Sequence, residues 1–175
     1  MPGTVTEPML DASQTKPLED AANRIIKKYT LIGTGLGLVP VTGVDVVANT
    51  GVQYFMIKEL TELYGLPFDE HFARVGMTAL GGSVLAGVAT YAISHVFGGG
   101  GGSSALTEAL SGAAISGTYT GLVGELYKSH FQSGGTLENL DVATYVEHIV
   151  EQVKSGELNV SSFSNPTRMF SYLTS

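Results

Sequence analysis

The chain has 175 residues and a formal net charge of −7 at pH 7, yet only 14% of its residues are charged, against about 25% in ordinary soluble domains. The negative charge argues against nucleic acid as a partner, because phosphate binding requires clustered Lys and Arg. The absence of Cys excludes disulfides and zinc–thiolate sites. Sparse charge and 23 glycines favour association with a membrane.

The N-terminal segment, residues 1–16, is rich in Pro, Gly and small polar residues, and we expect a flexible arm. A helix is predicted to begin at Pro17, because proline suits the first helical position. Its polar side carries a basic cluster, Arg24, Lys27 and Lys28, directly before a long uncharged run. Such a cluster favours contact with lipid headgroups and a cytoplasmic position for that end. A solvated helix face is the alternative.

The uncharged run is interrupted at Pro40-Val-Thr-Gly43. Proline disfavours helix in the residue before it, and glycine permits a turn. We therefore expect a first hairpin to turn here, with Thr42 or Asp45 capping the following helix and Gly65 ending it.

The longest apolar stretch, Val75 to Phe97, is preceded by Asp69 as a helix cap. As a helix, its 23 uncharged residues are long enough to cross a hydrocarbon layer of about 30 Å. A run of five glycines that includes Gly98, Gly100 and Gly102 then breaks the helix. This run predicts a second hairpin turn, followed by a second weakly charged helix.

Small side chains recur every four residues on both helices of this second pair, so they form stripes. We expect these stripes to pack helix against helix through Gly82, Ala86, Ala113, Gly117 and Gly121. Close backbone approach at small residues is how helices associate in lipid. A tightly packed soluble hairpin is the alternative.

The polar residues Lys128 to His130 are expected to return the chain to water. An amphipathic helix is predicted over 142–154, where apolar residues follow a helical spacing. The expected fold is all-α, with two glycine/proline-hinged apolar helical hairpins and a C-terminal amphipathic helix. The apolar hairpin domain would cover residues 17–132, and the C-terminal helix and tail residues 133–175.

Several motifs resemble the YcjF-like bacterial family of small helical membrane proteins, a family defined by a domain of unknown function. The matching segments lie between Ala21 and Thr136 and include Gly37-Leu-Val-Pro40, Gly43-Val-Asp45 and Phe131-Gln-Ser-Gly-Gly-Thr136. Relatives are often fused to small GTPase domains or encoded near them, so the resemblance implies a small GTPase as a partner. Nucleotide hydrolysis is not implied, because the chain has no Gly-x-x-x-x-Gly-Lys-Ser/Thr loop.

No residue set in the sequence amounts to a catalytic, cofactor or metal site. The four histidines lack metal-ligand spacing, and no serine lies in a Gly-x-Ser-x-Gly motif. We therefore expect neither an enzyme nor a cofactor.

The predicted function is a non-enzymatic, membrane-associated scaffold that self-associates through its small-residue stripes and shapes membrane or recruits a partner. The predicted location is a bacterial inner or intracellular membrane, with both polar ends facing the cytoplasm. Two alternatives remain open. One is a soluble self-assembling protein of a shell or filament, and the other is a channel or transporter component in which Asp45, Asn49 and Gln53 line a polar path.

Overall fold

The computed structural model describes residues 12–38, 44–81 and 105–155, and the structure is reported for these ranges alone. Within them all regular structure is helical, in five helices: α1 (Ala12–Leu36), α2 (Val44–Leu63), α3 (Glu70–Gly81), α5 (Ala105–Gln132) and α6 (Val142–Ser155). The all-α prediction is confirmed for this part of the chain, which contains no strand. No helix in the described ranges combines the length and the apolar character needed to cross a membrane.

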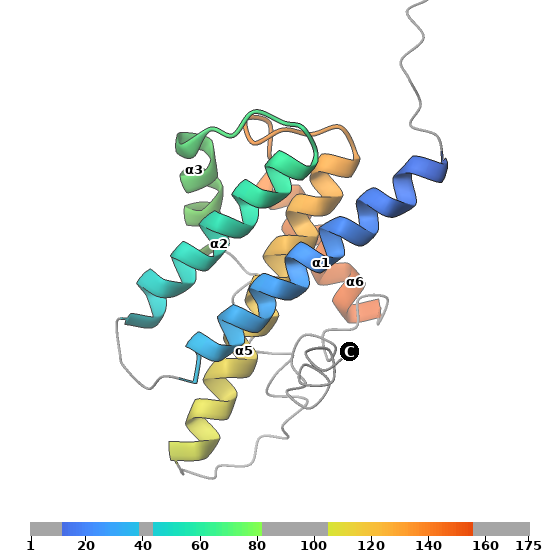
Figure 1. Ribbon diagram of the computed structural model, residues 1–175. Helices are drawn as coiled ribbons and strands as arrows, with labels where there is room; N and C mark the ends of the chain where they lie inside the picture. Colours follow the sequence, from blue (N-terminus) through green and yellow to red (C-terminus); the bar gives the residue numbers. More distant parts are fainter. Residues whose placement is uncertain (1–11, 39–43, 82–104, 156–175) are drawn as a thin grey trace, which may run out of the picture.

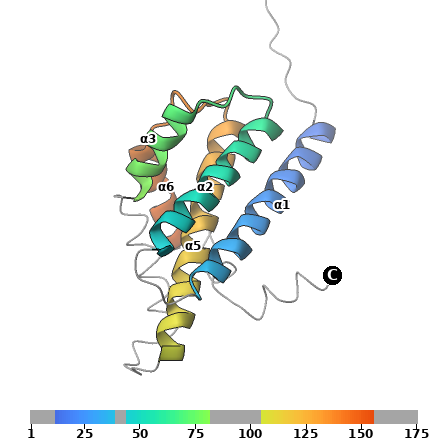
Figure 2. The ribbon, with the colours of Figure 1, turned by 60° about the vertical axis from the view of Figure 1, so that its left-hand side comes forward.

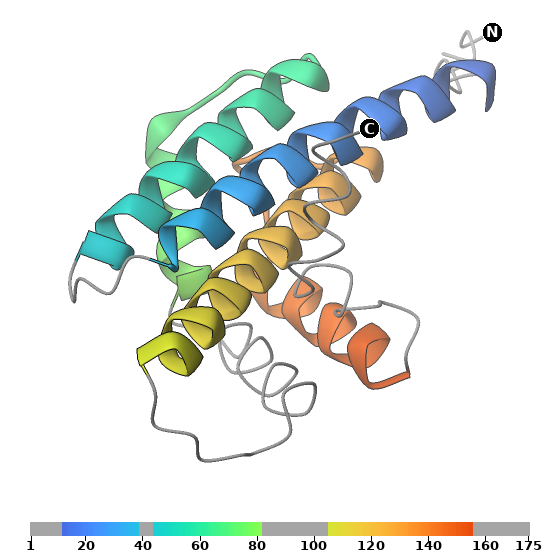
Figure 3. The same ribbon diagram turned by 60° about the horizontal axis from the view of Figure 1, so that its bottom comes forward.

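Helices α1, α2 and α5 form the centre of the molecule (Figure 1). Helices α1 and α2 lie side by side and run in opposite directions, as the predicted first hairpin requires. Helix α3 lies on the side of α2 away from α1 (Figure 2). Helix α6 lies on the opposite side of α5 from α1 and α2 (Figure 3).

Both predicted turns fall outside the described residues, so their geometry stays a prediction. This applies to Pro40 and Gly43 in the first turn and to Gly98, Gly100 and Gly102 in the second. The apolar stretch predicted from Val75 to Phe97 is described only as far as the end of α3.

Helix α1 begins at Ala12 and contains Pro17, so it starts earlier than the predicted first residue. Residues 12–16 therefore belong to the helix and not to an irregular arm. Proline removes one backbone hydrogen bond, the one to the carbonyl of Ser13, and this loss falls near the frayed end of the helix.

Two helices end on glycines in the left-handed conformation, Gly65 after α2 and Gly134 after α5, with φ values of 66° and 84°. After α5, Gly134 N donates to Phe131 O at 3.1 Å and Gly135 N donates to His130 O at 2.9 Å. This pair of bonds is the Schellman motif, which satisfies carbonyls left open at a helix end. The same pair of bonds follows α2. The predicted stop at Gly65 is confirmed.

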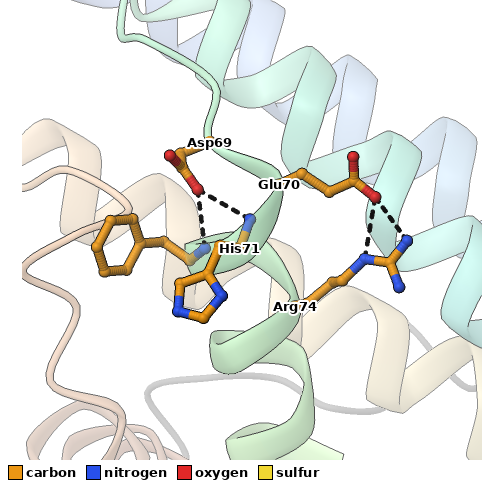
Figure 4. A network of polar contacts seen from close by, with 5 residues as sticks. Asp69, Glu70, His71 and Arg74 are labelled. Carbon is orange, nitrogen blue, oxygen red and sulfur yellow. Dashed lines mark hydrogen bonds and ion pairs between the residues drawn. The ribbon is translucent and has the colours of Figure 1, made fainter.

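The predicted cap of α3 is also confirmed. The Oδ1 atom of Asp69 accepts hydrogen bonds from the backbone N of His71 at 2.8 Å and of Phe72 at 3.2 Å (Figure 4). Within the first turns, Arg74 forms an exposed ion pair with Glu70, with Nε 3.0 Å from Oε1. Asp69 therefore satisfies two of the amide groups that the helix start leaves open.

The hydrophobic core lies mainly between α2, α3 and α5, with part of α1 packed against it. Its largest fully buried apolar and aromatic side chains are Tyr127, Met56, Ile57, Leu60, Leu80, Leu122 and Leu126. Because residues of α1 and α2 near Gly65 pack into this core, the core also determines which faces of the two helices point outward.

Candidate functional site

The closest backbone approach in the described part lies where α1 meets α5. A Cβ atom added to Gly37 would lie 2.6 Å from Gly112 O and 2.7 Å from Ala113 Cα. A Cβ atom at Gly33 would lie 2.7 Å from the Oγ1 atom of Thr120. Because real Cβ contacts are longer than these distances and the backbone atoms facing Gly37 cannot rotate away, the two helices require glycine at position 37.

On α5 this contact is made by a stripe of small residues spaced four apart: Gly112, Ser116, Thr120 and Gly124. The Ser116 hydroxyl donates to Gly33 O at 2.8 Å, and the Thr120 hydroxyl donates to Ser116 O at 2.9 Å. On α1, the Thr34 hydroxyl donates to Thr30 O at 2.9 Å. Three hydroxyls in this uncharged region are thus bonded to backbone carbonyls and do not depend on water.

The predicted stripe of Ala113, Gly117 and Gly121 lies one residue further along α5. All three residues are buried, although the side-chain contacts to α1 come from the neighbouring stripe. Their predicted partners, Gly82 and Ala86, lie outside the described residues. Packing between the two predicted stripes therefore stays a prediction.

The basic cluster lies exposed on α1, as expected for Arg24, Lys27 and Lys28. Lys28 forms an ion pair with Glu59 of α2, and its Nζ lies 4.5 Å from the centroid of the Tyr29 ring. The hydrogen bond to Glu59 raises the pKa of Lys28, and the same bond lowers the pKa of Glu59. Lys28 therefore has a partner within the chain, and headgroup contact by the cluster stays a prediction.

The surface changes character one helical turn beyond this ion pair. Ile32 follows Lys28 by one turn on α1, and Phe55 precedes Glu59 by one turn on α2. Residues four apart share a helix face, so both apolar side chains continue the surface of the ion pair. Ile32 is 44% exposed and Phe55 is 57% exposed.

Two glycines extend this apolar surface. A Cβ atom added to Gly35 or to Gly51 would meet no atom within 4 Å, so both positions face open space. We use the term hairpin face for six residues, Lys28, Ile32 and Gly35 on α1 and Glu59, Phe55 and Gly51 on α2.

Charge is segregated along the α1–α2 pair. From Tyr29 to Ile57 the sequence contains one charged residue, Asp45, which is the second residue of α2. The uncharged end of α1 and the start of α2 lie at the same end of the molecule as the start of α5 (Figures 1 and 3). The basic cluster and the last turns of α2 lie toward the other end.

Gln53, one of three residues considered for a polar path, is 5% exposed and lies beside Tyr119 of α5, so its role in a channel stays a prediction. The side chains of Asp45 and Asn49 fall outside the description. Burial raises the pKa of Tyr119 to about 12, and the amide of Gln53 offsets part of this rise. Burial also raises the pKa of Tyr127, so both phenols are protonated at neutral pH.

The described residues contain no group of three His, Asp or Glu that could hold a metal ion.

His130 was not expected to be buried, yet it is only 5% exposed. Its Nε2 atom lies 2.8 Å from Thr136 O and 3.1 Å from Asn139 Oδ1. Both partners accept hydrogen bonds, since Asn139 Oδ1 already accepts from Thr136 N, so Nε2 is the donor. The ring also lies against Gly135, where an added Cβ would be 2.2 Å from it. The motif from Phe131 to Thr136 is therefore a helix cap closed by a buried histidine.

Comparison with known proteins assigns the chain to a family. The model of DUF697, a domain of unknown function, matches residues 7–155. The chain belongs to the DUF697 family. The YcjF-like resemblance predicted from the sequence is thereby confirmed. One relative, magnetosome membrane protein 22 of Magnetospirillum gryphiswaldense, is 27% identical over 146 residues, which cover 78% of this chain and 70% of the relative. No solved structure matches the chain.

Proposed function

We propose that this DUF697 protein is a non-enzymatic, membrane-associated scaffold. The observation that carries the proposal is the segregation of charge, which leaves the α1–α2 pair with an exposed apolar surface and one charged residue between Tyr29 and Ile57. Large apolar side chains that gather on an exposed surface are typical of a contact with a membrane or another protein.

Of these two kinds of contact, the relative supports contact with a membrane, because it is named as a magnetosome membrane protein. By that similarity we propose an intracellular or inner bacterial membrane as the location, with the charged end of the molecule facing the cytoplasm. The charged end of the molecule would then be available to a protein partner. The family resemblance implies a small GTPase as this partner.

Self-association belongs to the same proposal, but its surface differs from the one expected. Ala113, Gly117 and Gly121 are buried within the chain. A contact between copies would therefore use other residues that the fold leaves exposed.

The experiment that tests the proposal is membrane fractionation of the full-length chain in its native host, followed by mass measurement in plain buffer and in detergent. We expect the chain to sediment with membranes, to resist a high-salt wash and to leave them only with detergent, as a uniform oligomer. A large uniform particle in the supernatant without detergent would contradict membrane association and support the soluble shell or filament. A soluble monomer would contradict both.

A further inference from the structure

We propose that the hairpin face lies along the surface of a bilayer, with Ile32 and Phe55 entering the boundary between headgroups and acyl chains of one leaflet. The inference rests on the proposed membrane association and adds the surface and the depth of the contact. It makes the α1–α2 pair an interfacial anchor parallel to the membrane plane.

Charges at both ends of the hairpin face set this orientation. The Lys28–Glu59 ion pair lies at one end of the hairpin face, and Asp45 belongs to the first turn of α2, beyond Gly51 at the other end. Between Asp45 and Glu59, α2 rises roughly 21 Å at 1.5 Å per residue. Entry with the turn first would carry Asp45 into the hydrocarbon, where a charge is costly. When the pair lies flat, both charged ends stay at headgroup level while the apolar strip between them faces the acyl chains.

Three hydroxyl groups of α1 and α5, behind the hairpin face, are compatible with this contact. Groups that face hydrocarbon must find their hydrogen-bond partners inside the protein. The hydroxyls of Thr34, Ser116 and Thr120 donate to backbone carbonyls at 2.8 to 2.9 Å. The uncharged region therefore loses none of these bonds when water leaves its outer surface.

The size of the strip favours lipid over a second copy of the chain. Ile32 and Phe55 are 44% and 57% exposed, so together they offer on the order of 200 Å² of apolar surface. A stable protein interface buries about 800 Å² on each partner. Beyond the ion pair, Arg24 and Lys27 are exposed on α1, so cationic side chains lie near the headgroup level that the flat orientation predicts.

The experiment uses the fact that the chain contains no Cys, so a single introduced cysteine carries one probe. Variants Ile32→Cys, Gly35→Cys and Phe55→Cys are labelled with an environment-sensitive fluorophore. Ala143→Cys is the matched control, because Ala143 is exposed on α6 and lies outside the apolar stretch that begins at Val75. Each labelled chain is mixed with vesicles of phosphatidylcholine and phosphatidylglycerol in equal parts, with nitroxide quenchers at shallow or deep positions of the acyl chain.

We expect the three hairpin-face probes to brighten and shift to the blue with vesicles and to be quenched best by the shallow nitroxide. The Ala143 probe should stay unchanged. If the labelled chains float with the vesicles while all four probes report an aqueous environment, the inference is wrong and the proposed function is left intact. Strongest quenching at the bilayer centre would overturn the interfacial depth. Loss of flotation for the unlabelled chain would overturn the proposed function as well.

A second measurement separates lipid contact from contact between copies. Phe55→Ser should weaken vesicle binding several-fold, whereas Ala143→Ser on α6 should leave it unchanged. If the hairpin-face probes instead become shielded without lipid, while the mass of the particle doubles, a second copy covers the face and the inference is wrong.

Discussion

Helix α1 has two faces that contain the same kind of residue for opposite reasons. On the face toward α5, Gly37 lies against backbone atoms of Gly112 and Ala113, and Gly33 lies against the Thr120 side chain. On the outer face, Gly35 meets nothing within 4 Å and lies beside the exposed side chain of Ile32. Three glycines at every second position thus alternate between close helix packing and an open surface. Glycine spacing alone does not distinguish the two uses.

The largest effect on stability is expected for Gly37→Ala. The new methyl group would lie within 2.8 Å of backbone atoms of Gly112 and Ala113, which cannot rotate away as a side chain would. Forcing α1 and α5 apart should lower the free energy of unfolding by about 3 kcal/mol, at the upper end of ordinary overpacking. Urea unfolding followed by circular dichroism, in the medium that keeps the chain dispersed, measures this change.

Gly35→Ala is the matched control, on the same helix but facing open space. Alanine is the better helix former, so this variant should gain about 0.5–1 kcal/mol. Equal stability of the two variants would contradict the asymmetry between the two faces of α1.

The next largest effect concerns membrane binding and the open face alone. Gly35→Glu adds a charge without a steric conflict, so the fold should survive. Burial of a carboxylate at the edge of the hydrocarbon should cost about 2 kcal/mol, roughly a thirtyfold loss of vesicle affinity. Vesicle flotation measures the change, with Gly35→Gln as the control of similar size and no charge. Equal affinities for the Glu and Gln variants would show that residue 35 stays in water.

The helix ends were predictable from sequence, because the residues that form them act locally. Asp69 caps α3 and Gly65 ends α2 through bonds to neighbours a few positions away. The same local reasoning placed the start of α1 at Pro17, whereas the helix begins at Ala12. A capped helix start and a glycine stop were therefore placed correctly, and a start marked by proline alone was not.

The candidate site was less predictable, because it depends on which helices meet. The sequence indicated small-residue stripes on α5 but not that Ser116 would face Gly33. It singled out Lys28 as a basic residue but not its pairing with Glu59, which is far away in the chain. The burial of His130 likewise follows from the loop that folds back over it. The two glycines that follow Phe131 were a sequence feature that indicated this burial, because glycine leaves room for a ring.

A smaller effect is expected at the end of α5, where Gly134 has a φ of 84°. A Cβ atom there meets no neighbour within 4 Å, so Gly134→Ala tests the backbone conformation alone. The left-handed conformation costs a residue with a Cβ about 1–2 kcal/mol, which a thermal melt would detect as a lower midpoint. Gly134→Asn should lose less, because asparagine tolerates this conformation. Equal losses for Ala and Asn would contradict this explanation.

The smallest effect, and the one that bears most directly on the boundary of the hairpin face, is expected for the Lys28–Glu59 ion pair. The pair is partly exposed, so Glu59→Gln should lower the free energy of unfolding at pH 7 by less than about 1 kcal/mol. Because Lys28 holds the pKa of Glu59 below its usual value of 4.5, this contribution is present above that value. It is lost as pH falls through the lower pKa of the folded state.

At alkaline pH the change of this stabilisation with pH has the opposite sign, because Glu59 raises the pKa of Lys28 above its usual 10.5. The stabilisation is complete below that value and is lost as pH rises through the raised pKa. Thermal melts of wild type and Glu59→Gln should therefore differ across the neutral range and converge at both extremes, and added salt should reduce the difference. A difference that persists unchanged in acid would show that Glu59 stabilises the hairpin by packing its side chain rather than by its charge.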